Sequence, residues 1–444
     1  MLLLLASTDV LGSQSSTVSS SARRDTCRYG SWSKPRWLER PTSFLAATRL
    51  AAAAVSGAAP AQGGRASVRA PVRYAAGVAG FLAIKFAGSA SPTQWPPQLR
   101  AIRLDGPSAG GPAGAFWFAY PRAAIDNDGT LHVVWAEPDD KLPTDPALLH
   151  GTVPELRSLW HATLHSGTWS PAKRIYRGER LQWDEVNASR LVVDGRNGLH
   201  IAFVGDDSAG PAVVYLRSEG AFWGRWRFAT SIRAGPIYLD LAIDGERRAA
   251  IAFVEPALFT LPRPNVLFLT QSFDAGRTWT RPLAVSAPDE DPAIEPHVFL
   301  DRDSAVQLEW VQQSLGGFTG GNLWHTVLAE TGRRSTSALP LPSNVITSHS
   351  QAAIDACGTI HVMTQAYPNG RSELQYARVT SGGWSTWSRP FDGTGAHASL
   401  AADGAMVHVV WDLDSRSPVD GAARSGLAHA TLPVFGPGHE DRRR

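Results

Sequence analysis

A motif that predicts a β-hairpin recurs six times in the chain. In its fullest form, residues 124–135, an apolar run meets an Asp/Gly turn, and an alternating run that ends in tryptophan follows. Two half-buried strands joined by residues that tolerate positive φ have this pattern. The turn aspartates of the six copies are Asp126, Asp194, Asp244, Asp301, Asp355 and Asp403. Their spacing of 48 to 68 residues favours a β-propeller, in which a four-stranded sheet repeats about every 40–50 residues.

The sequence after each hairpin supplies the other strands of a blade. A third apolar strand follows each hairpin, and in most copies a turn that carries tryptophan, such as Trp169 or Trp384, comes next. We therefore predict an all-β fold, a six-bladed β-propeller of four-stranded antiparallel blades over residues 94–435.

The sixth copy lacks a fourth strand of its own, because it ends after its third strand at Leu432. Residues 95–102 are similar in sequence to residues 169–175, which follow the third strand of the first copy. We therefore expect this N-terminal segment to add the missing outer strand, which would close the ring and remove an exposed edge.

The two ends of the chain do not share the repeat. Residues 1–73 are rich in Ser, Ala, Arg and Gly without a period of 2 or 3.6, so we expect a disordered leader or a start-site artefact. Residues 436–444 are expected to be a disordered tail. In residues 74–93 an apolar run follows arginines and precedes small residues, the order of a secretory signal peptide. The hypothesis is a natural start near residues 68–73 and a secreted protein; a loose hydrophobic helix is the alternative.

Composition excludes several classes of function. The net charge of +2 gives no field suited to nucleic acid, and the opening leucine run is too short to span a membrane. Cys27 and Cys357 lie in different sequence contexts, so a disulfide between them is not expected. No Cys/His cluster indicates a metal site, and we predict no cofactor. We expect a monomer.

Alternation along the first strand of each copy predicts which side chains face the central channel. The positions one and three before each turn aspartate are apolar in every copy, whereas those four and six before it are polar with one exception. These positions hold Tyr120, Arg122, Arg190, Tyr238, Asp240, Glu295, His297, His349, Gln351, His397 and Ser399. Asp184 lies at the mouth of the second blade. One face should pack between blades, and the other should form a polar ring around the axis.

The ring suits a particular class of ligand. Arginines, carboxylates and tyrosines at one end of a channel fit an anionic or polyhydroxylated ligand, with Arg as a bidentate partner for carboxylates. The alternative is a wet channel that any polar lining would serve. The repeated second-strand histidines lie in different blades, so they are interpreted as packing residues of the repeat; they are His132, His200, His361 and His408.

Residues 272–279, Ser-Phe-Asp-Ala-Gly-Arg-Thr-Trp, fit the Asp-box pattern S-x-D-x-G-x-x-W at every defined position. In such a turn the Asp carboxylate accepts backbone N–H groups, Gly adopts the left-handed conformation and Trp is buried between blades. Together with the propeller pattern, this motif makes residues 94–435 resemble the sialidase-like (BNR-repeat) propellers. The Asp-box is structural in that family, so it indicates the fold and not catalysis.

The resemblance implies a secreted carbohydrate-active protein that hydrolyses glycosidic bonds of an acidic glycan, as an exo-sialidase does. Family enzymes clamp the substrate carboxylate with three arginines and use a Tyr nucleophile, a Glu that activates it and an Asp acid/base. The positions that match are Arg122 and Arg190 for the clamp, Tyr238 or Tyr120 for the nucleophile, Glu295 for the base, and Asp240 or Asp184 for the acid. A third channel arginine and the family's Arg-Ile-Pro motif are missing. The alternatives are a non-catalytic propeller that binds glycans or a protein partner, and a structural module.

Overall fold

The computed structural model describes most of the repeated region and four short segments before it. The described residues are 28–33, 36–39, 72–77, 81–86, 122–137 (except 127), 157–182 (except 166–167 and 179), 189–229 (except 208–209, 220–221 and 225–226), 238–244, 247–255, 265–287, 292–301, 305–313, 321–329, 334–341, 348–367 (except 356), 372–391 (except 381–382), 396–402, 406–416 and 423–435. Every regular element in them is a β-strand. No helix in this part of the chain is long and apolar enough to cross a membrane.

Six antiparallel sheets of four to six strands follow one another along the described chain. The first contains β5 (Arg122–Ile125), β6 (Leu131–Glu137), β7 (Ser158–His165), β8 (Thr168–Trp169) and β9 (Lys173–Arg177). The second contains β10 (Arg180–Gln182), β11 (Ser189–Val193), β12 (Leu199–Asp207), β13 (Gly210–Glu219), β14 (Phe222–Trp223) and β15 (Arg227–Phe228). The third contains β16 (Tyr238–Asp244), β17 (Arg248–Glu255), β18 (Val266–Ser272) and β19 (Leu283–Ala284).

The remaining sheets have the same antiparallel order. The fourth contains β20 (Ala293–Leu300), β21 (Val306–Gln313), β22 (Gly321–Leu328) and β23 (Arg334–Pro340). The fifth contains β24 (Ser348–Ile354), β25 (Ile360–Ala366), β26 (Glu373–Thr380) and β27 (Gly383–Trp384). The sixth contains β28 (Ala396–Ala402), β29 (Met406–Arg416), β30 (Ala423–Phe435), β1 (Arg28–Tyr29) and β2 (Arg36–Glu39). A separate hairpin contains β3 (Val72–Gly77) and β4 (Phe81–Phe86).

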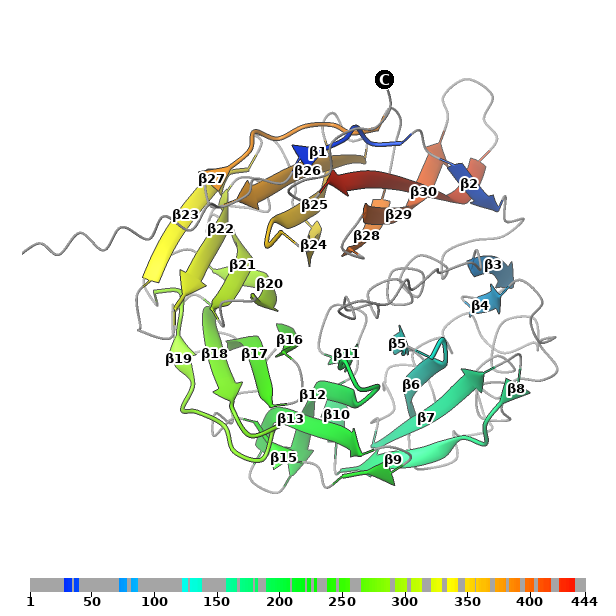
Figure 1. Ribbon diagram of the computed structural model, residues 1–444, viewed down its shortest axis with the longest axis vertical. Helices are drawn as coiled ribbons and strands as arrows, with labels where there is room; N and C mark the ends of the chain where they lie inside the picture. The colour runs from blue at the N-terminus through cyan, green and yellow to red at the C-terminus, as the bar shows by residue number, and fades with distance from the viewer. Residues whose placement is uncertain are drawn as a thin grey trace, which may run out of the picture.

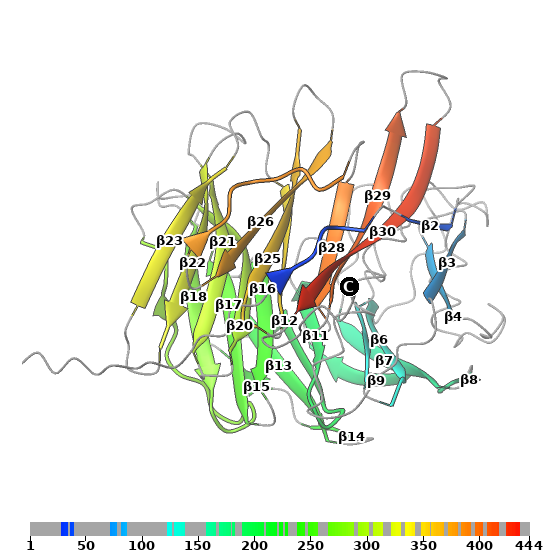
Figure 2. The same cartoon turned by 45° about the horizontal axis from the view of Figure 1, so that its top comes forward.

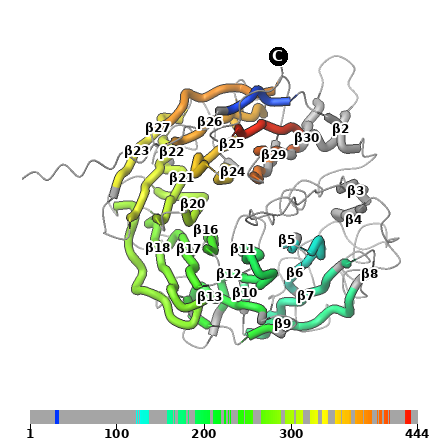
Figure 3. The backbone as a smooth tube through the Cα atoms, in the orientation of Figure 1, coloured from blue at the N-terminus to red at the C-terminus, as the bar shows by residue number. Residues whose placement is uncertain are grey.

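The six sheets surround a common centre. Figure 1 shows β5, β11, β16, β20, β24 and β28 innermost, with the later strands of each sheet further out. Figure 2 shows the sheets standing side by side, and the tube in Figure 3 follows them in chain order from cyan to red. This radial arrangement of antiparallel sheets is that of a β-propeller, so the predicted all-β propeller class is confirmed. The count of six blades for the complete chain and the closure of the ring stay predictions.

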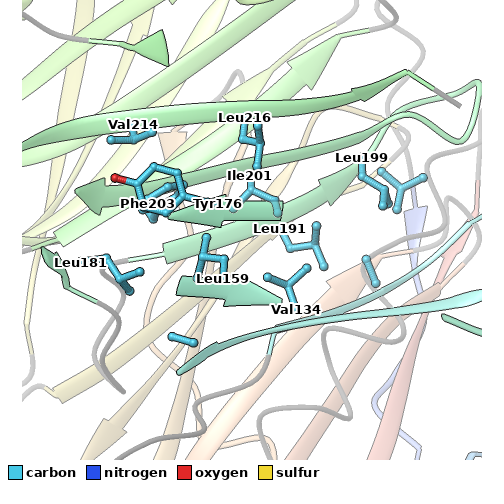
Figure 4. Close-up of a cluster of buried hydrophobic side chains, with 13 residues drawn as sticks. Val134, Leu159, Tyr176, Leu181, Leu191, Leu199, Ile201, Phe203, Val214 and Leu216 are labelled. Carbon is cyan, nitrogen blue, oxygen red and sulfur yellow. The ribbon is translucent and has the colours of Figure 1, made fainter. Parts of the chain in front are cut away.

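Hydrophobic side chains fill the spaces between successive sheets. Every residue of β25 is buried, because this second strand has a neighbouring sheet on each side. Between the first and second sheets, Val134 and Leu159 of one pack with Leu191, Ile201 and Phe203 of the other (Figure 4). Similar clusters join the second to the third sheet and so on to the sixth. The apolar positions one and three before the turn aspartates of the second to sixth copies belong to these clusters, as predicted.

A repeated set of hydrogen bonds ties the turn aspartates into their sheets. Asp194 Oδ1 accepts from the backbone N–H groups of Arg196 and Gly198, and its Oδ2 lies 3.0 Å from His200 Nε2. The other ring nitrogen of His200 bonds the Tyr215 hydroxyl. Equivalent contacts join Asp355, His361 and Tyr376 in the fifth sheet, and Asp126, His132 and His161 in the first. These histidines therefore connect a turn to a third strand; within the described residues, no group of three or more His, Cys, Asp or Glu is placed to hold a metal ion.

Residues 272–279 form the turn that their sequence predicts. Asp274 Oδ1 accepts from the Thr278 backbone N–H at 2.8 Å, and Gly276 has a φ of 81°. A Cβ atom on Gly276 would also collide with the ring of Tyr215 in the second sheet. Trp279 packs edge-on against the same ring, with centroids 5.1 Å apart. The Asp and Gly of this turn have the expected local geometry, and Trp279 is half-buried.

The sixth sheet contains strands from both ends of the chain. β1 and β2 both pair antiparallel with β30, so Arg28 lies opposite Phe435 and Tyr29 opposite Val434. The sequence analysis placed residues 28–39 in a disordered leader and assigned the outer strand to residues 95–102, which lie outside the described residues. That assignment is corrected here: the strands at the outer edge of β30 come from further upstream, where they pair backbone groups that would otherwise form an open edge.

Two more expectations concern the N-terminal region. The expectation that no disulfide forms is wrong for Cys357, which is disulfide-bonded. β3 and β4 form an antiparallel hairpin inside the segment that was predicted to begin a signal peptide. The signal peptide stays a prediction, and the tail 436–444 lies outside the described residues.

Candidate functional site

The polar residues predicted to line the channel lie on the innermost strands of the sheets. The structure describes the side chains of Arg122 on β5, Arg190 on β11, Tyr238 and Asp240 on β16, Glu295 and His297 on β20, and Gln351 on β24. His349 and His397 lie in β24 and β28, and their side chains are outside the described part. Tyr120 and Asp184 lie outside the described residues altogether.

An ion pair connects the second sheet to the third. Arg190 Nε donates to Asp240 Oδ1 at 2.6 Å, and the Arg190 side chain remains 34% exposed while that of Asp240 is 6% exposed. Asp240 also accepts from the backbone N–H of Leu241 at its Oδ1 and from that of Val298, in the fourth sheet, at its Oδ2. Burial would raise the Asp240 pKa, but Arg190 and His297 outweigh burial and lower the pKa of this carboxyl. Asp240 is therefore a buried carboxylate that fixes one edge of a half-exposed guanidinium.

His297 continues this contact into the fourth and fifth sheets. Its Nδ1 lies 3.8 Å from Asp240 Oδ2, which is an ionic contact too long for a hydrogen bond, and its Nε2 bonds the Ser350 carbonyl oxygen at 3.1 Å. Although burial disfavours the charged imidazole, Asp240 and Glu309 raise the pKa of His297 above its usual value. His297 thus joins three sheets at one buried point.

Glu295 is aimed at the fifth sheet by an irregular backbone. The β20–β21 register shifts between Ile294 and His297, and Glu295 has a φ of 49°, in the left-handed region that a residue with a Cβ seldom adopts. Its Oε2 accepts from the Ser350 backbone N–H at 2.7 Å. The Ser350 carbonyl also accepts from Gln351 Nε2. Ser350 is therefore a backbone anchor for side chains of two sheets, one of them held by a bulge next to the axis.

Glu309 is a part of this cluster that the sequence analysis missed. It lies on β21 directly opposite His297, it is completely buried, and its Oε2 is 3.9 Å from His297 Nε2. Neither carboxyl oxygen has a hydrogen-bond partner among the described residues. Burial raises the Glu309 pKa to about 8; His297 opposes that change, and the carboxylates of Glu295 and Asp240 add to it. Burial therefore favours the protonated form of the Glu309 carboxyl.

A signal for Glu309 was present in the sequence. The residue opposite the position four before the turn aspartate is apolar in the other five copies, where it is Val134, Ala202, Ala252, Met363 and Val410. Glu309 is the one charged residue at this position. Comparing second strands by register, and not only first strands, would have singled it out.

The predicted clamp and nucleophile positions have different surroundings. Arg122 Nε donates to the Ser189 carbonyl oxygen of the second sheet at 3.2 Å. Tyr238 is half-buried and packs against the hydrophobic cluster between the third and fourth sheets. The structure thus brings Arg190, Asp240 and His297 together and leaves Arg122 in a separate contact.

Three of the predicted residues are buried. Asp240, Glu295 and His297 are 4%, 5% and 2% exposed. Each contacts a backbone group of the neighbouring sheet, because innermost strands have an edge whose N–H and C=O groups need partners. These three residues of the predicted ring are therefore buried, and Arg190 is the part of the cluster that reaches solvent.

Comparisons with known proteins give a likeness of shape. No protein-family model matches the chain, and a search of curated proteins gives no match. Among solved structures, a protein of unknown function from Dyadobacter fermentans is 12% identical with a TM-score of 0.44, covering 72% of this chain and 95% of its own. An α-L-arabinofuranosidase from Fusarium graminearum is 12% identical (TM-score 0.42; 72% and 93% covered), and an ulvan lyase is 14% identical (TM-score 0.46; 67% and 78% covered).

Proposed function

We propose that the protein is a secreted, monomeric, six-bladed propeller of the sialidase-like kind that binds an acidic glycan and hydrolyses its glycosidic bond. The observation that carries this proposal is the state of Arg190. Its Nε is held at 2.6 Å by a buried carboxylate, while a third of the side chain remains exposed. A guanidinium fixed through Nε presents its terminal N–H groups in a set orientation, which suits a sugar carboxylate.

The cluster behind Arg190 supports a role in recognition. Asp240 accepts three hydrogen bonds and contacts His297, so its position is determined by the third and fourth sheets together. Binding sites gain affinity when charged groups are held in place before the ligand arrives. Arg122, at the equivalent position of the first sheet, is the second candidate for the carboxylate.

The catalytic roles are assigned within this proposal as follows. Tyr238 is the nucleophile, and Glu295 is the base that activates it. Asp240 is better suited to hold Arg190 than to donate a proton, since a general acid needs a raised pKa and that of Asp240 is lowered. The proton donor is then Asp184, the other acid that the sequence analysis proposed.

A second candidate function is a propeller that binds glycans without cleaving them. The burial of Glu295 and its hydrogen bond to the Ser350 N–H favour this candidate, because both restrict contact between Glu295 and a substrate. In that case Arg190 remains the group that recognises the acidic sugar, and Glu295 holds two sheets together.

A panel of fluorogenic glycosides, including a sialoside and a uronide, run beside a glycan array tests both candidates on the full chain. Hydrolysis that is lost in Tyr238→Phe and in Arg190→Ala supports the hydrolase. Binding without hydrolysis that is lost in Arg190→Ala supports the second candidate. Arg248→Ala, which changes an arginine bonded to Gln271 on the third sheet, is the matched control and should behave like the unchanged protein. Absence of both binding and hydrolysis contradicts both candidates.

A further inference from the structure

The N-terminal segment that completes the sixth sheet begins beside a cysteine. β1 starts at Arg28, one residue after Cys27, and Cys357 is disulfide-bonded in a chain that contains two cysteines. We propose that Cys27 and Cys357 form a disulfide that holds residues 28–39 on the propeller, so that this segment is a permanent part of the mature protein.

Backbone pairing places the segment in the position of an outer strand. Besides the β1–β30 pairs, the Gly30 N–H donates to the Pro433 carbonyl oxygen at 3.1 Å. The Ser33 N–H donates to the Thr431 carbonyl oxygen at 2.8 Å, and the Thr431 N–H donates to Ser33 Oγ at 3.0 Å. The same exchange joins Ser170 to Thr163 in the first sheet and Ser385 to Arg378 in the fifth. Residues 30–33 thus repeat a connection that other sheets make within themselves.

The tryptophan of the segment packs as its counterparts do. Trp32 lies edge-on to Tyr376 on the third strand of the fifth sheet, with ring centroids 5.3 Å apart. Pairs of the same kind join the second, third and fifth sheets to the sheet before each: Trp223 with His161, Trp279 with Tyr215, and Trp384 with His325. The sequences Gly30-Ser-Trp-Ser33, Gly167-Thr-Trp-Ser170 and Gly382-Gly-Trp-Ser385 share this pattern. Residues 30–33 therefore match the tryptophan turns of other sheets in both sequence and position.

Tyr29 joins residues 28–33 to the turn that contains Cys357 by direct contacts. Its hydroxyl donates to Asp355 Oδ2 at 2.9 Å and lies 2.7 Å from Thr359 Oγ1. Arg378 stacks over the Tyr29 ring, 4.2 Å from its centroid, and His361 lies against the ring edge. Cys357 is two residues from both Asp355 and Thr359, and Cys27 is two residues from Tyr29. These contacts place the two stretches of chain where a disulfide can join them.

The chemistry of the bond limits where it forms. Two cysteine thiols lose two protons and two electrons as the S–S bond forms, and the disulfide of an exchange oxidoreductase accepts both and becomes two thiols. Such oxidants act in export compartments, so the bond fits a secreted protein. This proposal and a natural start near residues 68–73 exclude each other, because a chain that begins there would lack Cys27.

Peptide mapping of the secreted full-length protein, alkylated before digestion, tests the bond directly. Trypsin releases Cys27 in residues 25–28 and Cys357 in residues 335–371. We expect these peptides joined in a non-reducing digest and separate after reduction. Recovery of both cysteines as alkylated thiols, or a mature protein that lacks Cys27, would overturn the proposal.

Thermal unfolding supplies a second test. Cys27→Ser and Cys357→Ser should each lower the unfolding temperature by about 5 °C, because a disulfide that closes a long loop restricts the unfolded chain. The double variant should be no less stable than either single variant, and reducing agent should bring the unchanged protein to the same value. Additive losses, or no difference between oxidised and reduced protein, would show that the cysteines act separately. Neither result depends on whether the protein binds a glycan.

Discussion

Two regions of the molecule bury aspartate and histidine side chains, and they do so in different ways. At the turns, Asp194 and His200, like Asp355 and His361, form hydrogen-bonded sets that end on a tyrosine of the same sheet. At the axis, Arg190, Asp240 and His297 join separate sheets. The cluster at the axis occurs once, whereas the turn sets recur.

The two regions also differ in how many of their buried polar atoms have hydrogen-bond partners. In the turn sets both histidine ring nitrogens and both carboxylate oxygens have partners. In the axial cluster, His297 Nδ1 and both oxygens of Glu309 have no hydrogen-bond partner among the described residues. Buried atoms without partners reduce stability, so they indicate a requirement other than folding. The turn sets are therefore fully paired parts of the fold, whereas the axial cluster keeps buried polar atoms without partners, as expected if it belongs to the proposed site.

The largest expected effect is the loss of Asp240. Asp240→Ala removes the partner of Arg190 and of two backbone N–H groups, so the free energy of unfolding should fall by about 3 kcal/mol. Urea unfolding measures it. Asp244→Ala on the same strand is the matched control, because the Asp244 side chain is exposed, and it should cost less than about 0.5 kcal/mol. Equal losses of unfolding free energy in the two variants would contradict a special role for Asp240.

The turn sets should be equivalent to each other. His200→Ala and His361→Ala each remove one hydrogen bond of a buried carboxylate and one of a tyrosine hydroxyl and leave a cavity, so each should cost about 2–3 kcal/mol. Glycan binding per folded molecule should not change in either variant. The control is His165→Ala, an exposed histidine at the end of β7. A loss of binding without a loss of stability would give the turn sets a functional role.

Glu309 should give the axial cluster its own pH dependence. Its folded-state pKa of about 8 lies above its ordinary value of 4.5, so between these values the folded protein retains a proton that the unfolded chain has lost. Stability therefore falls as the pH rises from about 5 to 8. Glu309→Gln cannot titrate, so its unfolding free energy should fall less steeply over this range in denaturant titrations. Parallel profiles for the two proteins would contradict the assignment.

The smallest effect is expected at the turn of residues 272–279. Asp274→Asn weakens the carboxylate hydrogen bonds from the Thr278 N–H and hydroxyl, at a cost of about 1 kcal/mol at neutral pH. Burial would raise the Asp274 pKa, but hydrogen bonds from Thr278 and Ser272 outweigh it and lower the pKa to about 2. The stability that the Asp274 carboxylate contributes is therefore present above its ordinary pKa of 3.8 and is lost as the pH falls toward 2. Acid denaturation of the two proteins should therefore converge at low pH. Curves that stay apart at pH 2 would contradict this reading.

Much of the fold could be predicted from the sequence, because each sheet repeats a local hairpin and a buried tryptophan turn. The propeller class and the apolar faces between sheets followed from strand alternation around residues such as Leu191 and Val193. The origin of the outer strand did not, because residues 30–33 match other blades at only three positions and lie within a stretch without period.

The site was less predictable than the fold. Alternation identified Arg190, Asp240 and His297 as one group, but it could not show that a bulge turns Glu295 toward the fifth sheet or that Asp240 is buried. Such features depend on how closely neighbouring sheets approach. Glu309 was visible only after the register of the second strands was known.

The most direct test of the central claim is the position of an acidic sugar in a crystal of the complex. The protein would be soaked with a short oligosaccharide that carries a carboxylate, and the electron density would locate that group. The account predicts the carboxylate within hydrogen-bond distance of the terminal nitrogens of Arg190, with Asp240 still bonded to Nε. A sugar bound elsewhere, with Arg190 contacting Asp240 alone, would contradict it.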